Sequence, residues 1–266
     1  MHYQEFLPET SLQDYIRYFW VLEDDTDNFS VKSFKIIPDG IPTLIFQEKP
    51  NLFFDMDAQA APQLYIQGQS TKFTEHRVMG NFRIIGVYLQ PTALKTIFNI
   101  DAFEFNDQKV PLEDIITEPI LQQLINAVSL KQKIKIISNF LLKHISKVER
   151  NTEKATIASL FLQNGKTLKE TQIEMNLSER SLERLIKQYV GMPPKMFSRI
   201  LRFQSGLNIL RQADFNSLTE IAYQNEYFDQ SHYIREFKGF TGTNPERFML
   251  NANEKLLNFP LWDASK

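Results

Sequence analysis

The stretches LKETQIEMNLSERSLERLIKQY (168–189) and LTEIAYQNEYFDQSHYIREFKGF (218–240) decide the fold of the C-terminal part of this chain. Each has the spacing of a helix, a short turn and a second helix whose apolar residues face inward. The two second helices are expected to begin at Glu179 and Gln230, 51 positions apart. A helix over about residues 195–211, about 25 Å long at 1.5 Å per residue, joins the units. Two helix-turn-helix patterns in series indicate a chain built to read duplex DNA.

Capping residues mark where these helices begin. Thr167 is followed three positions later by Glu170, and Ser217 by Glu220, which are capping-box patterns. Ser178 is placed to cap the second helix of the first unit. These positions predict helix starts at residues 168, 179 and 218.

The apolar positions of each unit predict its small core, and the remaining positions predict its outer face. The inward residues are expected to be Leu168, Ile173, Leu177, Leu182, Leu185 and Ile186 in the first unit, and Ile221, Ala222, Tyr227, Tyr233 and Phe237 in the second. The candidate DNA-binding residues are then Glu179, Arg180, Ser181, Glu183, Arg184 and Lys187, with Gln230, Ser231, His232, Arg235 and Lys238. Arginine can bind guanine and glutamine can bind adenine through paired hydrogen bonds, whereas lysine and serine more often hold phosphates. A solvated, charged face of an all-α domain is the alternative interpretation.

The N-terminal half has a different pattern. Short runs rich in aromatic and β-branched residues, separated by turn residues, predict strands over 15–22, 34–37, 43–46, 64–66 and 82–89. Many short strands of this kind are typical of a small barrel or sandwich. After Pro91, a short helix is expected.

Residues 119–148 return to a helical period with two apolar stripes. Core packing is the more common use of such stripes, and contact with a second copy of the chain is the alternative. The polar segment 147–152 is the predicted linker between two domains.

Composition limits the function. The chain has 266 residues, 42% of them hydrophobic and 23% charged, and a net charge of −2. That charge is uneven: residues 150–250 hold 14 basic and 11 acidic side chains, whereas residues 1–149 hold 14 and 19. A locally basic C-terminal half has the sign that phosphates favour. The absence of an apparent signal segment or apolar span leads us to expect a cytoplasmic protein without membrane partners.

The sequence does not favour an enzyme. It has no cysteine and only four histidines, of which only His76 falls among the predicted strands. A metal-dependent centre of the kind that small barrels carry needs a cluster of histidines with a carboxylate. Neither a nucleophile elbow nor a phosphate-binding glycine loop appears. We therefore expect no catalytic residue, no metal and no cofactor.

The segment IAYQNEYFDQSHYIREFKGFTGTNPERF (221–248) resembles the signature of the AraC/XylS family of transcriptional regulators, and residues 177–204 resemble that family's upstream half. The resemblance implies a double helix-turn-helix domain with a core at 152–250, and usually a separate sensing or dimerising domain before it. The family generally has glycine where this chain has Glu226, in the turn of the second unit. We therefore expect the first reading helix to contribute more to base recognition than the second.

The N-terminal half resembles, more loosely, the cupin-like sensor domains of related regulators, around residues 36–46 and 82–98. A barrel of this type can enclose a small molecule. The candidate lining residues are Trp20, Phe46, Tyr65 and Tyr88, with ordinary core packing as the alternative.

Together these features predict an α+β chain of two domains. Residues 1–149 form a cupin-like barrel or sandwich with flanking helices (β-rich over 1–110, helical over 111–149), and residues 150–266 form the all-α DNA-binding domain. The expected partners are double-stranded DNA, a small-molecule effector, the transcription machinery, and a second copy through residues 119–148. A non-catalytic ligand-binding or interaction protein that keeps the fold without specific DNA binding is the alternative.

Overall fold

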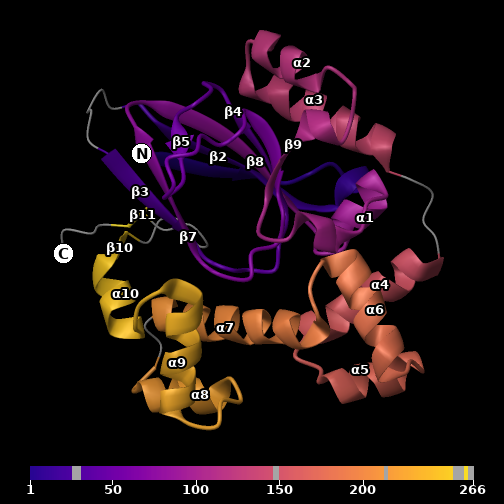
Figure 1. The fold of residues 1–266 in the computed structure, drawn as a ribbon, viewed down its shortest axis with the longest axis vertical. Coiled ribbons are helices and arrows are strands. Elements are labelled where there is room, and N and C mark those ends of the chain that lie inside the picture. Colours follow the sequence, from indigo (N-terminus) through magenta and orange to yellow (C-terminus); the bar gives the residue numbers. More distant parts are fainter. Residues whose placement is uncertain (26–30, 146–149, 213–214, 254–260, 263–266) are drawn as a thin grey trace.

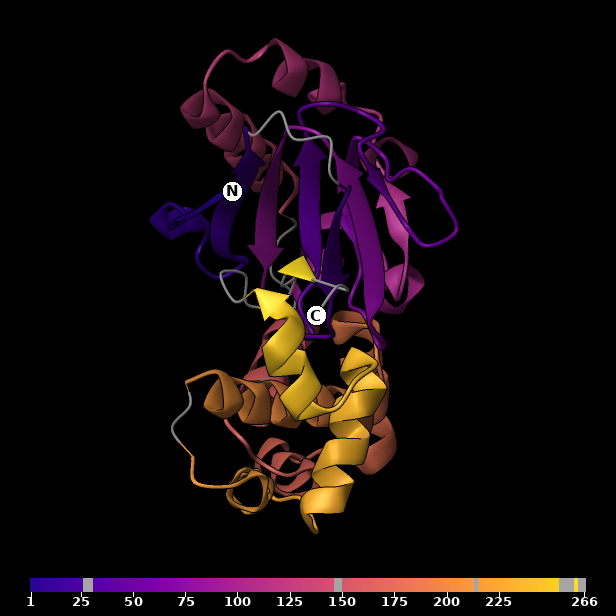
Figure 2. The same ribbon diagram turned by 90° about the vertical axis from the view of Figure 1, so that its left-hand side faces the viewer.

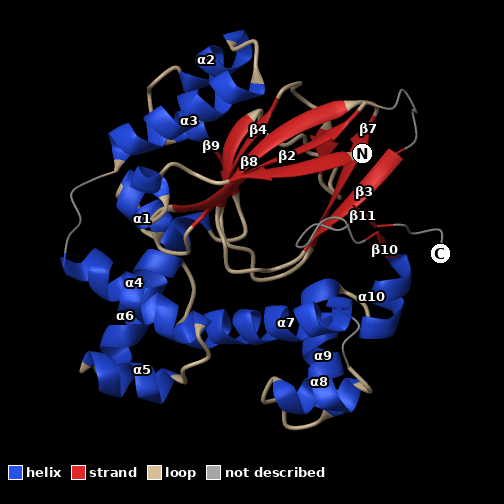
Figure 3. Cartoon of the chain, turned by 180° about the vertical axis from the view of Figure 1, so that it is seen from behind, coloured by secondary structure: helices blue, strands red, loops and turns tan. Residues whose placement is uncertain are grey.

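The computed structural model describes residues 1–25, 31–145, 150–212, 215–253 and 261–262 (Figure 1). The strands gather in one part of the molecule together with three helices of the N-terminal half, and the C-terminal helices form the other part, as Figures 2 and 3 show from two further sides. The C-terminal helices lie along one end of the sheets, with α7 (Pro194–Gln212) running across this part. The predicted α+β class is confirmed.

Two antiparallel sheets form the N-terminal part. The first sheet has the order β1-β2-β8-β4-β6-β9, and the second has the order β10-β11-β3-β7-β5. The strands are β1 (His2–Phe6), β2 (Ile16–Asp24), β3 (Val31–Ile36), β4 (Thr43–Gln47), β5 (Phe53–Phe54), β6 (Leu64–Gln67), β7 (Thr74–Met79), β8 (Phe82–Leu89), β9 (Lys109–Pro111), β10 (Ala252–Asn253) and β11 (Leu261–Trp262). Of the two architectures expected, the structure has the sandwich.

Alternation along β4 shows why the first sheet is buried on both faces. Leu44 and Phe46 pack in a core between this sheet and the helices of the N-terminal part, whereas Ile45 packs in a second core between the two sheets. Successive side chains of a strand point to opposite faces, so one strand supplies both cores. Gly86 of β8 is needed for the same packing, because a Cβ there would lie 2.0 Å from the indole of Trp20.

The helices of the N-terminal part are α1 (Ala93–Phe98), α2 (Ile120–Asn126) and α3 (Leu130–His144), with 3₁₀ turns η1 (Thr10–Leu12), η2 (Ala102–Phe105) and η3 (Leu112–Asp114). The apolar stripe predicted over 119–148 is largely used here: Leu124, Ile137 and Leu141 are buried against the first sheet. The core interpretation of that stripe is therefore confirmed for these positions.

The C-terminal helices are α4 (Arg150–Gln163), α5 (Leu168–Met175), α6 (Glu179–Val190), α7 (Pro194–Gln212), α8 (Leu218–Gln224), α9 (Gln230–Thr241) and α10 (Pro245–Asn251). They share a core separate from the two of the sandwich. None of the helices in the described parts of the chain is long and apolar enough to span a bilayer.

Several predicted boundaries need correction. The predicted strands match β2, β3, β4, β6 and β8, whereas β1, β5, β7 and β9 were not predicted. Residues 147–149 of the predicted linker lie outside the described residues, and residues 150–152 already belong to α4. The C-terminal strand β11 pairs with β3 of the sandwich, although the sequence assigned residues 150–266 to the helical domain.

Candidate nucleic-acid interface

The first helix-turn-helix unit is held by local hydrogen bonds that the sequence predicted. Thr167 and Glu170 form a complete capping box at the start of α5. Asn176 ends α5 in the left-handed conformation, with φ of 50°, which asparagine tolerates better than most residues. Ser178 then caps α6 by accepting a hydrogen bond from the backbone N–H of Ser181. The sequence therefore fixes both ends of the turn that sets the angle between α5 and α6.

The second unit has the same plan with a less favourable turn. Ser217 caps α8, and Asp229 caps α9 by accepting a 2.7 Å hydrogen bond from the backbone N–H of His232. Between these helices, Glu226 adopts φ of 56°. A residue with a Cβ pays about 1 kcal/mol or more for this conformation, which glycine adopts freely. Glu226 therefore has the backbone conformation that favours the glycine usual at this position in the resembling family.

Replacing Glu226 by glycine is expected to raise the free energy of unfolding by about 1 kcal/mol, because the backbone strain is relieved. Urea denaturation of the full chain measures the change. The matched control is Asn176→Gly, at the equivalent turn of the first unit, where the gain is expected to be smaller. A Glu226→Gly protein no more stable than the wild type would contradict the strain at this turn.

Most of the predicted inward residues form the core of the two units. Leu182, Ile186, Ile221, Ala222, Tyr227, Tyr233 and Phe237 are buried, and Leu168, Leu177 and Leu185 are partly buried against them. Ile173 is the exception, because 70% of it is exposed. Its position in the short helix α5 places it on the outer side, so the prediction for Ile173 was wrong.

The eleven candidate DNA-binding residues all retain accessible surface. Nine are exposed, and Ser181 and His232 are half-buried. Two of them already have local hydrogen bonds: the hydroxyl of Ser181 lies 2.9 Å from that of Ser178, and the side-chain oxygen of Gln230 accepts a 2.6 Å hydrogen bond from Thr219. The structure therefore brings the six residues of α6 together and the five residues of α9 together, on two helices joined through α7.

A buried ion pair, which sequence reasoning missed, fixes α9 against α7. Glu236 is almost fully buried, and its two carboxylate oxygens accept hydrogen bonds from Arg199 Nε at 2.8 Å and Arg202 Nη2 at 3.0 Å. Burial alone would raise the pKa of Glu236, but these two hydrogen bonds and the charges of both guanidinium groups outweigh it and lower the pKa. Arg202 also stacks 4.4 Å from the ring centroid of Tyr227. These contacts fix the orientation of the second reading helix.

The C-terminal ends of both reading helices contact the sandwich. At α6, the side chain of Asn106 donates to the carbonyl of Gly191. At α9, Lys35 Nζ donates a 2.9 Å hydrogen bond to the carbonyl of Thr241, the last residue of the helix. Between them, Gln204 of α7 donates a 2.6 Å hydrogen bond to the carbonyl of Pro38. The sandwich therefore contacts α6, α7 and α9.

Two of the candidate residues lie near this contact. Lys187 Nζ is 5.4 Å from the ring centroid of Phe103, and Arg235 lines a crevice that also includes Thr71 of the sandwich. Both lie in the C-terminal two-thirds of their helices. The residues in the first turns of α6 and α9 are thus the ones furthest from the sandwich along each helix.

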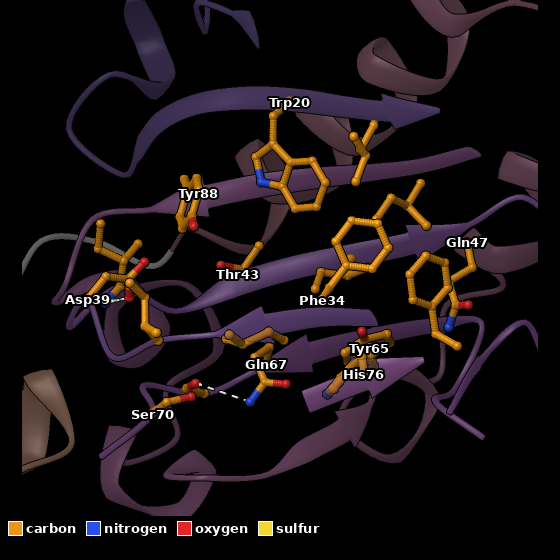
Figure 4. A pocket seen from close by; sticks show the side chains of 18 residues that line it. Trp20, Phe34, Asp39, Thr43, Gln47, Tyr65, Gln67, Ser70, His76 and Tyr88 are labelled. Carbon is orange, nitrogen blue, oxygen red and sulfur yellow. Dashed lines mark hydrogen bonds between the residues drawn. The ribbon is translucent and has the colours of Figure 1, made fainter. Parts of the chain in front are cut away.

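The sandwich contains a cavity between its two sheets (Figure 4). Trp20, Tyr65 and Tyr88, three of the four predicted lining residues, line it. Phe46 does not, because it lies on the opposite face of β4 and packs toward the helices. The sequence prediction for Phe46 was therefore wrong, and the period of two along β4 explains the error.

The match to known families covers the two halves of the chain separately. Residues 173–251 match a helix-turn-helix domain, and residues 4–111 match a domain of unknown function (DUF6597). Similar curated proteins include the uncharacterized HTH-type transcriptional regulator YidL of Escherichia coli, 24% identical over 156 residues, or 56% of this chain and 52% of YidL. The HTH-type transcriptional activator RhaS of Salmonella arizonae is 35% identical over 65 residues, or 24% of this chain and 23% of RhaS. The chain therefore spans about half the length of YidL and less than a quarter of RhaS.

Among solved structures, ToxT of Vibrio cholerae is similar over 87% of this chain and 98% of ToxT, with a TM-score of 0.45 and 11% identity. The capped units, their shared core and the match over residues 173–251 define a double helix-turn-helix protein. The C-terminal part of the chain is therefore a helix-turn-helix domain, similar to those of the HTH-type regulators YidL and RhaS.

Proposed function

We propose that the protein is a transcriptional regulator that reads two successive major-groove segments of duplex DNA with α6 and α9. The observation that carries this proposal is the pair of capped helix-turn-helix units joined by α7, each with an exposed polar face on its second helix. In such units the first turns of the second helix contact the base edges. Arg180 and Arg184 are therefore the main candidates for base recognition in the first unit, with Gln230 and Ser231 in the second.

We further propose that a small molecule in the sandwich cavity modulates DNA binding. Strand β3 supports this link, because Phe34 and Ile36 line the cavity while Lys35, between them, reaches the end of α9. The turn after β3 supports it as well. Gly40 lies so close to α7 that a Cβ would come 2.8 Å from the ring of Phe197, and the neighbouring Asp39 lines the cavity. A ligand that moves this wall would move residues in contact with α7 and α9.

Selection of bound duplexes from a random pool tests the DNA-binding proposal directly. We expect enrichment of one sequence containing two short conserved segments, with affinity that falls steeply as salt rises because phosphate contacts release counterions. A chain that retains the fold without reading DNA would enrich nothing, or would bind all duplexes alike. A DNA-binding role of this kind requires the compartment that holds the genome, and it assigns the chain no catalytic step.

Association with a second copy through residues 119–148 remains a prediction. In the described part of this region, the large apolar side chains left exposed are Ile125 and Val128, with 47% and 89% of their surface accessible. We expect the full chain to show a concentration-dependent mass in sedimentation, and the double variant Ile125→Ser/Val128→Ser to lose it. Leu250→Ser, which removes an equally exposed side chain from α10, is the control. A wild-type chain that stays monomeric at high concentration would contradict the prediction.

A further inference from the structure

The cavity of the sandwich has walls from both sheets and is built mainly of rings. Trp20, Tyr65 and Tyr88 come from the first sheet, and Phe34 and Phe53 come from the second. The cavity itself has a volume of about 70 Å³, and the 720 Å³ of empty space around it includes open solvent at its mouth. Flat, apolar walls of this kind suit an aromatic ring, and ring faces also attract a cation.

Strand β4 runs along the cavity and gives its length. Thr43, Ile45 and Gln47, every second residue, line it. Four residues of extended strand cover about 13 Å. Figure 4 shows Asp39 at one end of this row and Gln47 at the other. The cavity is therefore elongated, with a polar group at each end and rings between them.

At the Gln47 end, a residue of the cavity wall has a buried acceptor without a donor. Gln47 is only 1% exposed, and its Nε2 donates to the carbonyls of Ala61, at 3.2 Å, and Pro62, at 2.7 Å. These two bonds fix the amide so that Oε1 is its remaining polar atom, and no donor among the described residues reaches it. A buried acceptor left unsatisfied costs stability. A ligand that donates an O–H or N–H to Oε1 would therefore gain binding free energy.

At the other end, the cavity presents a carboxyl group. One oxygen of Asp39 accepts a 2.9 Å hydrogen bond from the backbone N–H of Ile41. Burial raises the pKa of Asp39 to about 6, although that hydrogen bond, Arg17 and Tyr88 oppose the rise. Asp39 is therefore mainly ionised at neutral pH, and it keeps accessible surface while it lines the cavity.

The charges around the cavity select against anions. Among the described residues that line it there is no lysine and no arginine. His76 lines it as well, but burial lowers the pKa of its imidazole to about 3, so it is neutral at physiological pH. A carboxylate or phosphate ligand would find no cation among the lining residues, because Arg17, whose charge acts on Asp39, is not one of them. Burying an unpaired charge is costly.

From these contacts we propose that the cavity binds a small aromatic amine, with its ammonium group against Asp39, its ring among Trp20, Phe34 and Tyr65, and a hydrogen-bond donor at its far end against Gln47. This inference specifies the ligand class of the effector site in the proposed function, and therefore rests on it for its regulatory meaning. Binding itself is testable without DNA.

Isothermal titration of the full chain with three probes tests the ligand class. Tyramine has an ammonium group, a ring and a phenolic donor; phenethylamine lacks only the donor; 4-hydroxyphenylacetate replaces the ammonium group with a carboxylate. We expect tyramine to bind most tightly, phenethylamine several-fold more weakly because one hydrogen bond is lost, and the carboxylate not at all. An anion that binds as well as tyramine, or the absence of binding by both amines, would overturn the proposal.

Variants locate the site. Asp39→Asn keeps the acceptor for the Ile41 N–H but removes the charge, and we expect it to weaken tyramine binding about tenfold or more. Gln47→Met fills similar volume without an acceptor, and we expect it to remove the preference for tyramine over phenethylamine. Asp57→Asn, an exposed site, is the control. Unfolding temperatures of all three variants show whether each is folded. A folded Asp39→Asn protein that binds tyramine like the wild type would overturn the assignment.

The pH dependence provides a second test. The titratable side chains that face Asp39 are Arg17 and Tyr18 of β2 and Tyr88 of β8, while α7 presents Phe197 and Ile200 to the turn that carries it. Of these groups, only Asp39 changes charge between pH 7 and pH 5. With a pKa of about 6, its ionised fraction falls from about nine-tenths to about one-tenth, so we expect the tyramine affinity to fall about tenfold. An affinity that is constant over this range would contradict the ammonium–carboxylate contact.

These results separate the inference from the proposed function. If DNA selection succeeds and neither amine binds, only the ligand class is wrong. If tyramine binds with the expected dependence on Asp39 and no duplex is enriched, the sensor site is supported and the DNA-reading proposal fails.

Discussion

Replacing Glu236 by glutamine is expected to lower the free energy of unfolding by about 2–4 kcal/mol. The carboxylate is buried and binds both Arg199 and Arg202, so its loss leaves two guanidinium groups without their anion. Part of the cost is relieved because Arg199 and Arg202 are themselves 41% and 28% exposed and can be hydrated. Urea denaturation of the full chain measures the difference. Because the pair joins α9 to α7, the variant should also bind DNA more weakly.

The matched control is Glu183→Gln, the same substitution at an exposed position of α6, which is expected to change stability by less than about 0.5 kcal/mol. The pH dependence distinguishes charge from shape. The folded pKa of Glu236 lies below its unfolded value of about 4.3, so its contribution is full above that value and disappears as pH falls through the folded pKa. A wild-type advantage that did not shrink at acid pH would contradict the charge-pair explanation.

Replacing Arg184 by alanine is expected to weaken binding to the selected duplex by about 1–3 kcal/mol, or about five- to 150-fold in Kd, and to relax sequence preference at one position. Arg184 is exposed on α6, on the turn of the helix that follows Arg180. Competition between the selected duplex and single-base variants of it, at fixed salt, measures both effects. Lys131→Ala, an exposed lysine of α3 in the sandwich part, is the control for a change in net charge. Unchanged affinity and unchanged preference would remove Arg184 from the reading face.

The helical half was predictable from the sequence because its signals are local. Thr167, Ser178 and Ser217 cap the helices that their positions indicated, and the apolar spacing identified most of the buried residues. Glu226 was recognisable as unusual for the same reason, since it stands where the resembling family has glycine, and the turn holds it at a positive φ. What the sequence did not reveal is the Glu236 pair, because Arg199 and Arg202 are more than 30 positions away.

The sandwich was less predictable because its contacts are between distant strands. The aromatic residues of the cavity were expected, but Phe46 was assigned to it in error, since a strand buried on both faces has no polar side to indicate orientation. Asp39 was explained by its turn, and it does hold that turn through Ile41. Asp39 also forms part of the cavity wall. That role depends on how the two sheets pack together, and no local sequence pattern indicates it.

The central claim is that two units read two successive segments of one duplex. Footprinting of the selected duplex with wild type, Arg184→Ala and Arg235→Ala tests it most directly. We expect two protected segments about one turn, or about 10 base pairs, apart, with Arg184→Ala weakening protection of one and Arg235→Ala of the other. The Arg235 effect is expected to be the smaller, because Arg235 shares its crevice with Thr71 of the sandwich and its helix follows the strained turn at Glu226. A single protected segment, or the same loss at both segments from either substitution, would contradict the account.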